Sequence, residues 1–301
     1  MRLYVIGSEG QVARSLREAA AANPDITIRC STRSDLDLLR IEQIERALAE
    51  FSPDIVVNPA AYTAVDRAET EPDLAYSINS KAAGAVASAA SRLDVPVIHL
   101  STDYVFDGKN PAPYVETDAT SPQSVYGRSK LAGEVAVASA ADRYLILRTS
   151  WVYAPYGNNF VKTVMRLARQ RDRLGIVNDQ IGCPTYAPDI ADAIIAIARQ
   201  IAGSGWQSGH GGVTHLAGPD EMSWFEFARR IVLDLATRRD RPARVEAIST
   251  KDYPTAAVRP ANSRLNCDRL NSVFGLRLPH SSQSLRICLD RLCDPAHANL
   301  E

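Results

Sequence analysis

Short, mostly apolar segments alternate with longer segments of helical length through the first half of this chain. Apolar segments of four or five residues between loops are typical of strands buried on both faces. Their alternation with helices predicts a parallel sheet that is covered on both sides. We expect strands at 3–6, 26–30, 55–57, 97–100 and 144–147, and helices at 11–22, 41–51, 72–93 and 125–138.

The second half of the chain is less regular. We expect helices at 161–170, 189–200, 224–235 and 284–292, an exposed loop at 203–212, and one more strand of the sheet at 213–216. The fold class is therefore α/β, a Rossmann-like doubly wound parallel sheet with a smaller, mixed α/β C-terminal domain. The predicted boundaries are residues 1–154 plus 186–217 for the dinucleotide-binding domain, and residues 155–185 plus 218–301 for the substrate domain.

Composition narrows the classes of partner. The 34 Lys and Arg residues nearly balance the 35 Asp and Glu residues, which gives no long-range attraction to nucleic acid or to an anionic membrane. No apolar stretch approaches the roughly 20 residues that span a bilayer. The five cysteines are scattered and form no Cys-x-x-Cys pair, so we expect reduced thiols and a cytoplasmic location. The expected partners are small molecules.

A glycine-rich turn follows the first predicted strand. In Gly7-Ser8-Glu9-Gly10-Gln11-Val12-Ala13, Gly7 permits the tight turn, Gly10 permits close approach of a phosphate, and Ala13 takes the place of a third glycine. Backbone N–H groups and the positive end of the following helix bind dinucleotide diphosphates at such turns. We therefore expect a dinucleotide here; a ligand-free strand–helix turn is the alternative.

Ser31-Thr32-Arg33 follows the second strand, where an NAD-specific chain would carry a carboxylate for the ribose hydroxyls. A hydroxyl and the Arg33 guanidinium can hold a 2′-phosphate, so NADPH is the preferred cofactor. Asp35 and Asp37 lie close in sequence and keep NADH as an alternative. The simpler reading of Arg33 is a solvated loop charge.

Tyr126 and Lys130 stand four residues apart in Ser124-Val125-Tyr126-Gly127-Arg128-Ser129-Lys130. On a helix this spacing places a phenol and an ammonium on one face, and we expect the cation to lower the pKa of the phenol toward the working range. Thr102 follows the fourth strand at the same sheet edge and could donate a hydrogen bond to a substrate oxygen. The alternatives are a solvated surface pair for the first two residues and a turn-stabilising role for Thr102.

Together these motifs resemble the extended short-chain dehydrogenase/reductases, and more narrowly the dTDP-4-dehydrorhamnose reductase family. The segments that carry the resemblance are the glycine turn, Ser101-Thr102-Asp103-Tyr104-Val105-Phe106, Tyr126-x-x-x-Lys130, Arg148-Thr149-Ser150-Trp151-Val152-Tyr153, Asn58 to Glu69, Gly157-Asn158-Asn159-Phe160, Asn178 to Thr185 and Arg259 to Leu265. They extend over nearly the whole chain.

The resemblance implies NADPH-dependent reduction of the C4 ketone of dTDP-4-dehydro-L-rhamnose to dTDP-L-rhamnose. It implies that Tyr126 delivers a proton to the ketone oxygen, that Thr102 hydrogen-bonds that oxygen, and that Lys130 tunes Tyr126 and holds the nicotinamide ribose. It also implies cofactor contacts and sugar-nucleotide contacts. The cofactor contacts are Gly10, Gln11, Val12, Asp37, Leu38, Ala61, Tyr62 and Thr63, and the sugar-nucleotide contacts are Asp103, Trp151 and Arg259.

One departure from the family concerns metal binding and assembly. Some members carry a glutamate on the first helix and join subunits through a carboxylate-bound magnesium ion, whereas this chain has Ser15 there. We therefore predict no metal ligands from the sequence; whether magnesium binds stays open, and a homodimer stays a candidate assembly.

Four other functions compete with this reading. A 4,6-dehydratase usually has Glu directly after the Thr-Asp pair, where this chain has Tyr104, and the wider motifs disfavour a 4-epimerase. A reductase that makes another dTDP-6-deoxyhexose, such as the C4 epimer dTDP-6-deoxy-L-talose, would keep the same catalytic residues. A non-catalytic NADP-binding regulatory subunit, like the related beta subunit of methionine adenosyltransferase, is the alternative outside catalysis.

Overall fold

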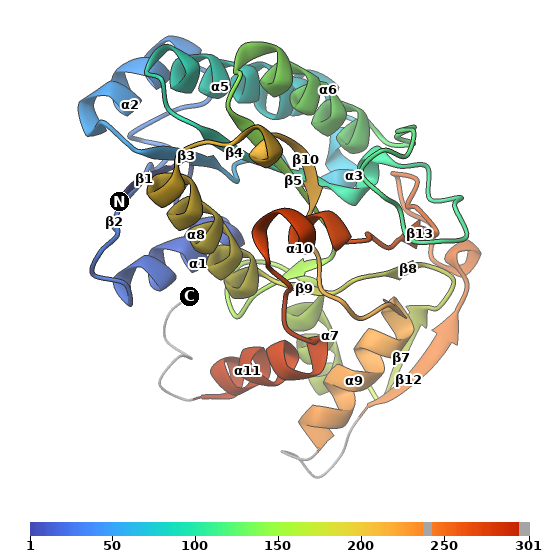
Figure 1. Cartoon of the computed structure of the whole chain (residues 1–301). Coiled ribbons are helices and arrows are strands. Elements are labelled where there is room, and N and C mark those ends of the chain that lie inside the picture. Colours follow the sequence, from blue (N-terminus) through green and yellow to red (C-terminus); the bar gives the residue numbers. More distant parts are fainter. Residues whose placement is uncertain (237–242, 295–301) are drawn as a thin grey trace.

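The computed structural model describes residues 1–236 and 243–294. A six-stranded parallel sheet forms its centre, in the order β10-β5-β4-β3-β1-β2 (Figure 1). The strands are β1 (Arg2–Val5), β2 (Thr27–Cys30), β3 (Ile55–Asn58), β4 (Val97–Thr102), β5 (Tyr144–Thr149) and β10 (Gly212–His215). The predicted doubly wound α/β fold is confirmed, including the return of the chain to the sheet at β10.

Helices cover both faces of this sheet because its strands are apolar on both faces. Along β4, Ile98 and Leu100 pack into the core beneath one set of helices, while His99 and Ser101 point toward the other side. One face carries α1 (Gln11–Ala21) and α8 (Ala187–Ser204); the other carries α2 (Ile44–Phe51), α5 (Ala83–Arg92) and α6 (Val125–Ala140).

Strand order reverses between β1 and β3, since the chain passes from β1 outward to β2 and then returns to β3 on the other side of β1. Ligands of doubly wound sheets bind at the carboxyl ends of the strands beside such a switch point. The Gly7 turn follows β1, and Thr102 is the last residue of β4, so both lie at this edge.

The rest of the chain forms a second layer of helices with small sheets, in the lower part of Figure 1. Its core joins α7 (Phe160–Gln170), α9 (Trp224–Ala236) and α11 (Ser281–Cys293) to β7 (Arg173–Val177) and β12 (Arg244–Ile248). Shorter strands pair at β6 (Val152–Tyr153), β8 (Ile181–Gly182), β9 (Thr185–Tyr186), β11 (Met222–Ser223) and β13 (Asn262–Ser263). The mixed character predicted for this region is confirmed.

The division into two domains stays a prediction. Helix α10 (Asp268–Phe274), which the prediction assigned to the substrate domain, contributes Leu270 and Phe274 to the core beneath the central sheet. Residues 237–242 and 295–301 of the predicted substrate domain lie outside the described residues.

The structure refines one predicted element and corrects another. The helix expected at 72–93 is confirmed as one unbroken helical segment, in which α4 (Pro72–Tyr76) and α5 are joined by a π-helical turn (Ser77–Ala82) whose Asn79 bonds to neighbouring segments. The loop expected at 203–212 is wrong in part: α8 continues to Ser204, and His210 is buried because its ring stacks on Phe274.

Candidate active site

The predicted catalytic residues meet at the carboxyl end of β4. Thr102 ends β4, and Tyr126 lies in the first turn of α6, where both side chains are buried. The start of α6 is fixed by Ser124, whose Oγ accepts from Gly127 N at 3.1 Å, and by Glu69, whose Oε1 accepts from Val125 N at 2.7 Å. These caps fix where Tyr126 enters the site.

Burial raises the pKa of Tyr126 above its usual value, and Asp103 and Tyr104 raise it further. The Thr102 hydroxyl beside it opposes this rise in the pKa of Tyr126. Thr102 Oγ1 itself donates to Asp103 Oδ1 at 3.0 Å. The expectation that Lys130 lowers the pKa of the phenol is wrong for this structure, because burial dominates and the ammonium is directed elsewhere. The phenol is therefore protonated at neutral pH.

Lys130 is buried on α6, and its Nζ donates to Leu100 O of β4 at 2.6 Å. His99 Nε2 lies 3.4 Å from the same Nζ. Burial lowers the pKa of Lys130 to about 8, while the Glu134 carboxylate on the next turn of α6 raises it. Tyr126 and Lys130 are thus not the solvated surface pair of the alternative reading.

Glu134 fastens α6 to the sheet in a buried ion pair. Its carboxylate accepts two bonds from Arg148 of β5, at 2.6 and 2.9 Å, and one from Ser101 Oγ of β4 at 2.5 Å. A bidentate geometry with a third donor offsets much of the desolvation that burial of the charges costs. The helix that carries Tyr126 and Lys130 is thereby held in register with β4 and β5.

Asp103 is buried beside Thr102, and burial raises its pKa to about 6. Its Oδ1 accepts from Thr102 Oγ1, whereas Oδ2 has no hydrogen-bond partner among the described residues. Ser263 and then Thr102 are the main groups that oppose the rise in the pKa of Asp103. A buried acceptor left open at the edge of a site is available to a ligand hydroxyl.

The turn after β1 can accept a diphosphate. Gly7 has φ +92°, a conformation that side chains rarely adopt, and its N–H donates to Ser31 Oγ at 3.1 Å. Gly10 caps α1 without a side-chain hydrogen bond, no acidic residue occupies the first turn, and no atom lies within 4 Å of the place where its Cβ would be. The open N–H groups at this helix end fit an anion.

Gln11 and Val12, the other residues predicted at this turn, differ in exposure. Val12 is buried in the core, so only its backbone faces outward. Gln11 Oε1 accepts from Asn159 Nδ2 at 2.9 Å, which ties the start of α1 to the cap of α7. The predicted cofactor turn is therefore joined to the second layer of the molecule.

The loop after β2 holds the residues predicted to select the cofactor. Arg33 is exposed, and within the described residues no hydrogen bond or ion pair of its side chain is found. Asp35 is occupied with Thr32 N and Oγ1, at 2.8 and 2.7 Å, and Asp37 Oδ1 accepts from Leu39 N at 3.0 Å. Leu38 packs beside the core formed with α2. Neither carboxylate is therefore paired with the Arg33 guanidinium.

Sequence reasoning missed Asn79, which lies buried in the π-helical turn. Its side chain accepts from Tyr62 N at 2.7 Å and donates to Tyr62 O at 3.2 Å and to Ser129 Oγ at 2.9 Å. The loop that carries Ala61, Tyr62 and Thr63 is thereby fixed against α6. The available signal was an Asn within an otherwise alanine-rich helical segment; π-helical turns often occur at functional sites.

Trp151 and Arg259, predicted to meet the sugar nucleotide, come from separate segments. Trp151 has φ +49° and its ring stacks on Trp224, with centroids 3.4 Å apart. A Cβ at Gly182 would lie 2.3 Å from the Trp151 ring, so glycine is needed there. Arg259 donates to Asp66 Oδ2 at 2.8 Å and to Tyr104 Oη at 3.1 Å. No sequence motif pointed to Trp224.

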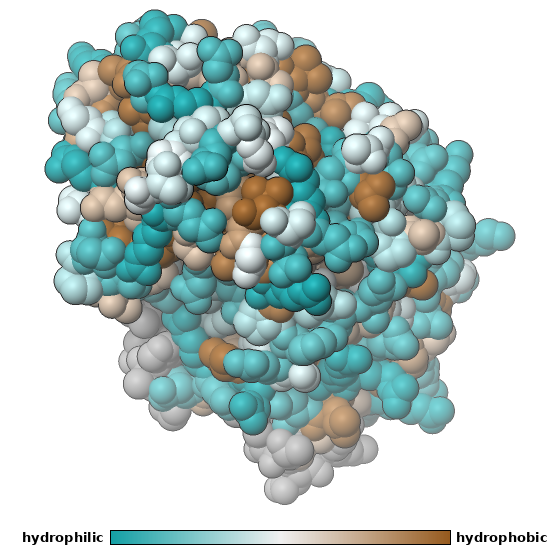
Figure 2. Space-filling model, viewed as in Figure 1, coloured by the Kyte–Doolittle hydropathy of each residue, from teal (hydrophilic) through white to brown (hydrophobic). Residues whose placement is uncertain are grey.

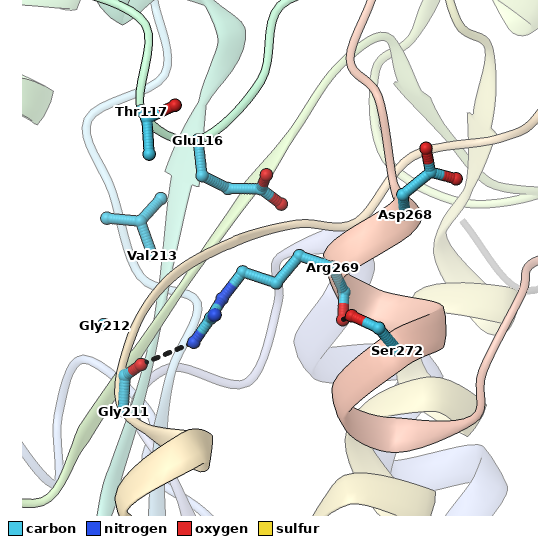
Figure 3. A pocket seen from close by; sticks show the side chains of 8 residues that line it. All are labelled: Glu116, Thr117, Gly211, Gly212, Val213, Asp268, Arg269 and Ser272. Atoms are coloured by element: carbon cyan, nitrogen blue, oxygen red, sulfur yellow. Dashed lines mark hydrogen bonds between the residues drawn. The ribbon is translucent and has the colours of Figure 1, made fainter.

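A separate depression of about 640 Å³ lies along the outer edge of β10 (Figure 3). Arg269 crosses it and donates to Gly211 O at 2.8 Å, and Glu116 faces it from the opposite side. None of the predicted site residues lines it. Elsewhere the face shown in Figure 2 is largely hydrophilic, with small separate apolar patches.

Ser15, the departure noted on the first helix, is buried. Its hydroxyl donates to Gln11 O at 2.8 Å and bonds to the Tyr156 hydroxyl, so it does not fit the role of a magnesium ligand. Within residues 1–236 and 243–294, no three His, Cys, Asp or Glu side chains gather closely enough to hold a metal ion. No described helix combines the length and apolar character needed to cross a membrane.

Known proteins match this chain over nearly its whole length. The family model described as the RmlD substrate binding domain matches residues 1–293. A dTDP-4-dehydrorhamnose reductase from Sinorhizobium fredii is 50% identical over 286 residues, which cover 95% of this chain and 96% of the relative. The chain belongs to the dTDP-4-dehydrorhamnose reductase family. The family member from Escherichia coli K12 is 40% identical over 297 residues, covering 97% and 98% of the two chains.

Solved structures agree with this membership. The family member from Bacillus anthracis, solved in complex with NADP, has a TM-score of 0.88 and 36% identity, covering 96% of this chain and 98% of that one. A UDP-glucose 4-epimerase from Brucella ovis, solved with NAD, has a TM-score of 0.78 but only 17% identity, covering 97% and 98%, and so shares the fold alone.

Proposed function

We propose that this chain reduces the C4 ketone of dTDP-4-dehydro-L-rhamnose to dTDP-L-rhamnose. The observation that carries the proposal is the meeting of Thr102, Tyr126 and the buried Lys130 at the carboxyl end of β4, in a member of this family. NADPH is the proposed cofactor, because the Gly7–Gly10 turn fits a diphosphate and Arg33 is free to meet a 2′-phosphate. The relative from Bacillus anthracis holds NADP.

In the proposed site, the residues predicted from the sequence contact different parts of the cofactor and of the sugar nucleotide. Gly7, Gly10, Gln11 and the backbone of Val12 hold the diphosphate end. The adenine end meets Arg33, Asp37 and Leu38, and the middle meets Ala61, Tyr62 and Thr63. Asp103, Trp151 and Arg259 hold the sugar nucleotide, with Arg259 meeting its diphosphate.

The geometry suits proton delivery. Reduced nicotinamide, when bound, supplies the hydride for the ketone carbon. The raised pKa of Tyr126 keeps a proton on the phenol until negative charge grows on the ketone oxygen, and Thr102 shares the hydrogen bonding to that oxygen. Lys130, cationic at neutral pH, is assigned the nicotinamide ribose, the other role that the family resemblance implies for it. Burial of all three side chains strengthens these interactions.

We also propose the domain division predicted from the sequence, with the sugar nucleotide lying between the central sheet and the second layer. The Asp66–Arg259 bond and the Gln11–Asn159 bond support it, because each joins segments far apart in the chain across this boundary.

The proposal is tested by mixing the protein with dTDP-4-dehydro-L-rhamnose and either NADPH or NADH, following nicotinamide absorbance and identifying the sugar by NMR. Formation of dTDP-L-rhamnose, with NADPH oxidised faster than NADH, supports the proposed function and cofactor. Formation of dTDP-6-deoxy-L-talose would redirect the proposal to the C4 epimer. Tight NADPH binding without turnover would contradict it and favour the regulatory-subunit function.

A further inference from the structure

His99 is a buried titratable residue that the proposed chemistry does not use. It lies in the middle of β4 with 0% of its surface exposed, and its ring points toward α6, away from the core formed by Ile98 and Leu100. Its Nε2 lies 3.4 Å from Lys130 Nζ, while Nδ1 has no hydrogen-bond partner among the described residues. A fully buried ring with one contact to a proposed catalytic residue calls for a physical account.

The ammonium of Lys130 has three N–H donors, and each buried donor needs an acceptor. Leu100 O takes one at 2.6 Å, and His99 Nε2 lies in position to take a second. The contact with His99 is long for a hydrogen bond, but no water competes strongly at a buried site. Two N–H groups of Lys130 are then directed at β4, which leaves the third N–H group to point out of the interface between α6 and β4.

We propose that His99 is a positioning residue for the reductase reaction, a neutral imidazole whose Nε2 accepts a hydrogen bond from the Lys130 ammonium and so holds that charge in place. The role of His99 in turnover rests on the proposed function, whereas the contact between His99 and Lys130 is independent of that function.

The surrounding charges support a neutral ring. Burial and the Lys130 cation both lower the pKa of His99 well below its usual value. Glu134, the carboxylate on α6 that acts on Lys130, is occupied by Arg148 of β5 and Ser101 of β4. Tyr126, on the preceding turn of α6, is protonated. Besides the backbone carbonyl of Leu100, the His99 imidazole is therefore the acceptor that β4 offers to the Lys130 ammonium. The single proton of the neutral ring then lies on Nδ1.

The tautomer can be measured in the unchanged protein. In ¹⁵N-labelled, cofactor-free protein at pH 7, a ¹H–¹⁵N correlation of the histidine rings is expected to show His99 with Nδ1 protonated and Nε2 unprotonated. A ring protonated on Nε2 would overturn the proposal, because it would have no lone pair facing Lys130.

The effect on Lys130 can be followed directly, since the chain has only five lysines to assign. In protein labelled with ¹³C at the lysine ε-carbon, His99→Met removes the acceptor and is expected to lower the pKa of Lys130 by about one unit, because a hydrogen bond to the charged form favours it. His99→Gln places an oxygen near the position of Nε2 and is expected to restore most of the loss.

His210→Met is the matched control, since His210 is also buried but packs against Phe274 and Trp206. It is expected to leave the pKa of Lys130 unchanged. An unchanged pKa of Lys130 in folded His99→Met would overturn the proposal, and if that variant does not fold, the tautomer measurement decides.

The pH dependence of turnover is a second readout. We expect His99→Met to shift the alkaline limb of kcat/KM to lower pH by the same amount as the pKa of Lys130. A shift in the Lys130 titration without any reductase activity in the wild type would sink the proposed function but leave the contact standing.

Discussion

At the scale of the residue, the site depends on polar side chains that are buried with few partners. Thr102, Asp103 and Tyr126 lie in two short segments of chain, and burial is the main cause of the raised pKa of both Asp103 and Tyr126. The local spacing of Tyr126 and Lys130 indicated the chemistry. It did not indicate how the lysine is directed, because that depends on β4, which the chain reaches some 30 residues earlier.

Thr102→Val is expected to lower kcat about 100-fold, because a hydrogen bond to the developing negative charge is lost. It also removes the bonds of Thr102 Oγ1 to Asp103 and from Tyr104 N, so the free energy of unfolding is expected to fall by about 1–3 kcal/mol. Steady-state kinetics and thermal unfolding check both parts. Thr149→Val is the matched control, because Thr149 pairs with Thr102 across β4 and β5 and its buried hydroxyl has no hydrogen-bond partner among the described residues. Equal losses in both variants would contradict the assigned role of Thr102.

Asp103→Asn is expected to stabilise the protein at pH 7.5 while it lowers activity. The folded-state pKa of Asp103 is raised to about 6, so between its unfolded value and pH 6 the folded state binds more protons and stability falls as pH rises. Asparagine removes this cost, which is about 1–3 kcal/mol above pH 6, and keeps the acceptor for Thr102. Denaturant unfolding at pH 4 and pH 7.5 measures the effect. A variant equally destabilised at both pH values would show that the carboxyl is not strained by burial.

At the scale of the element, α6 is the helix on which the site is built. Glu69 caps it, Glu134 joins it to β4 and β5, and Asn79 joins it to the loop after β3. The π-helical turn that holds Asn79 packs closely on this helix. A Cβ at Gly133 would lie 2.0 Å from Asn79 O.

Gly133→Ala is therefore expected to destabilise the protein by roughly 2–4 kcal/mol, because the backbone of the π-helical turn must move away from α6. Gly203→Ala is the control: Gly203 is also helical, and nothing lies within 4 Å of the added Cβ, so a gain of roughly 0.5–1 kcal/mol is expected. Chemical denaturation compares the two. A mild effect at Gly133 would mean that the turn is not fixed against α6.

The elements also show what a sequence can predict. Strands β1, β3, β4 and β5 were predicted within two residues because buried parallel strands are short apolar runs. Strands β7 and β12 were missed, since Arg173–Val177 and Arg244–Ile248 carry charges and glycine and are defined by pairing with each other. The π-helical turn was missed because it arises from contacts of Asn79 with Tyr62 and Ser129, which lie 17 and 50 residues away.

At the scale of the whole molecule, the predicted substrate residues join distant parts of the chain. Arg259 reaches Asp66, 193 residues earlier, and Trp151 stacks on Trp224. A sequence motif could suggest Arg259 as a phosphate ligand, but its present partners follow only from the tertiary fold. The same holds for Trp224, whose position is set by the start of α9.

Arg259→Gln is expected to raise KM for the dTDP-sugar about 10- to 100-fold with a smaller change in kcat, since one charged contact to the diphosphate is lost. Stability should change by less than about 1 kcal/mol, because the ion pair with Asp66 is partly exposed. The double variant Asp66→Asn/Arg259→Gln tests whether an unpaired Asp66 causes the effect, and Glu246→Gln, in an exposed pair with Arg173, is the control. Recovery of KM in the double variant would contradict a direct role for Arg259.

In the proposed reaction the nicotinamide supplies hydride to C4 of the sugar and Tyr126 supplies a proton to its oxygen. The most direct measurement uses NADPH dideuterated at the nicotinamide C4 with dTDP-4-dehydro-L-rhamnose, followed by NMR of the product, for the wild type and for Tyr126→Phe. We predict dTDP-L-rhamnose with deuterium at C4, and loss of at least about 100-fold in rate in the folded, NADPH-binding variant. Deuterium at another carbon, the C4 epimer as product, or full activity of Tyr126→Phe would contradict the account.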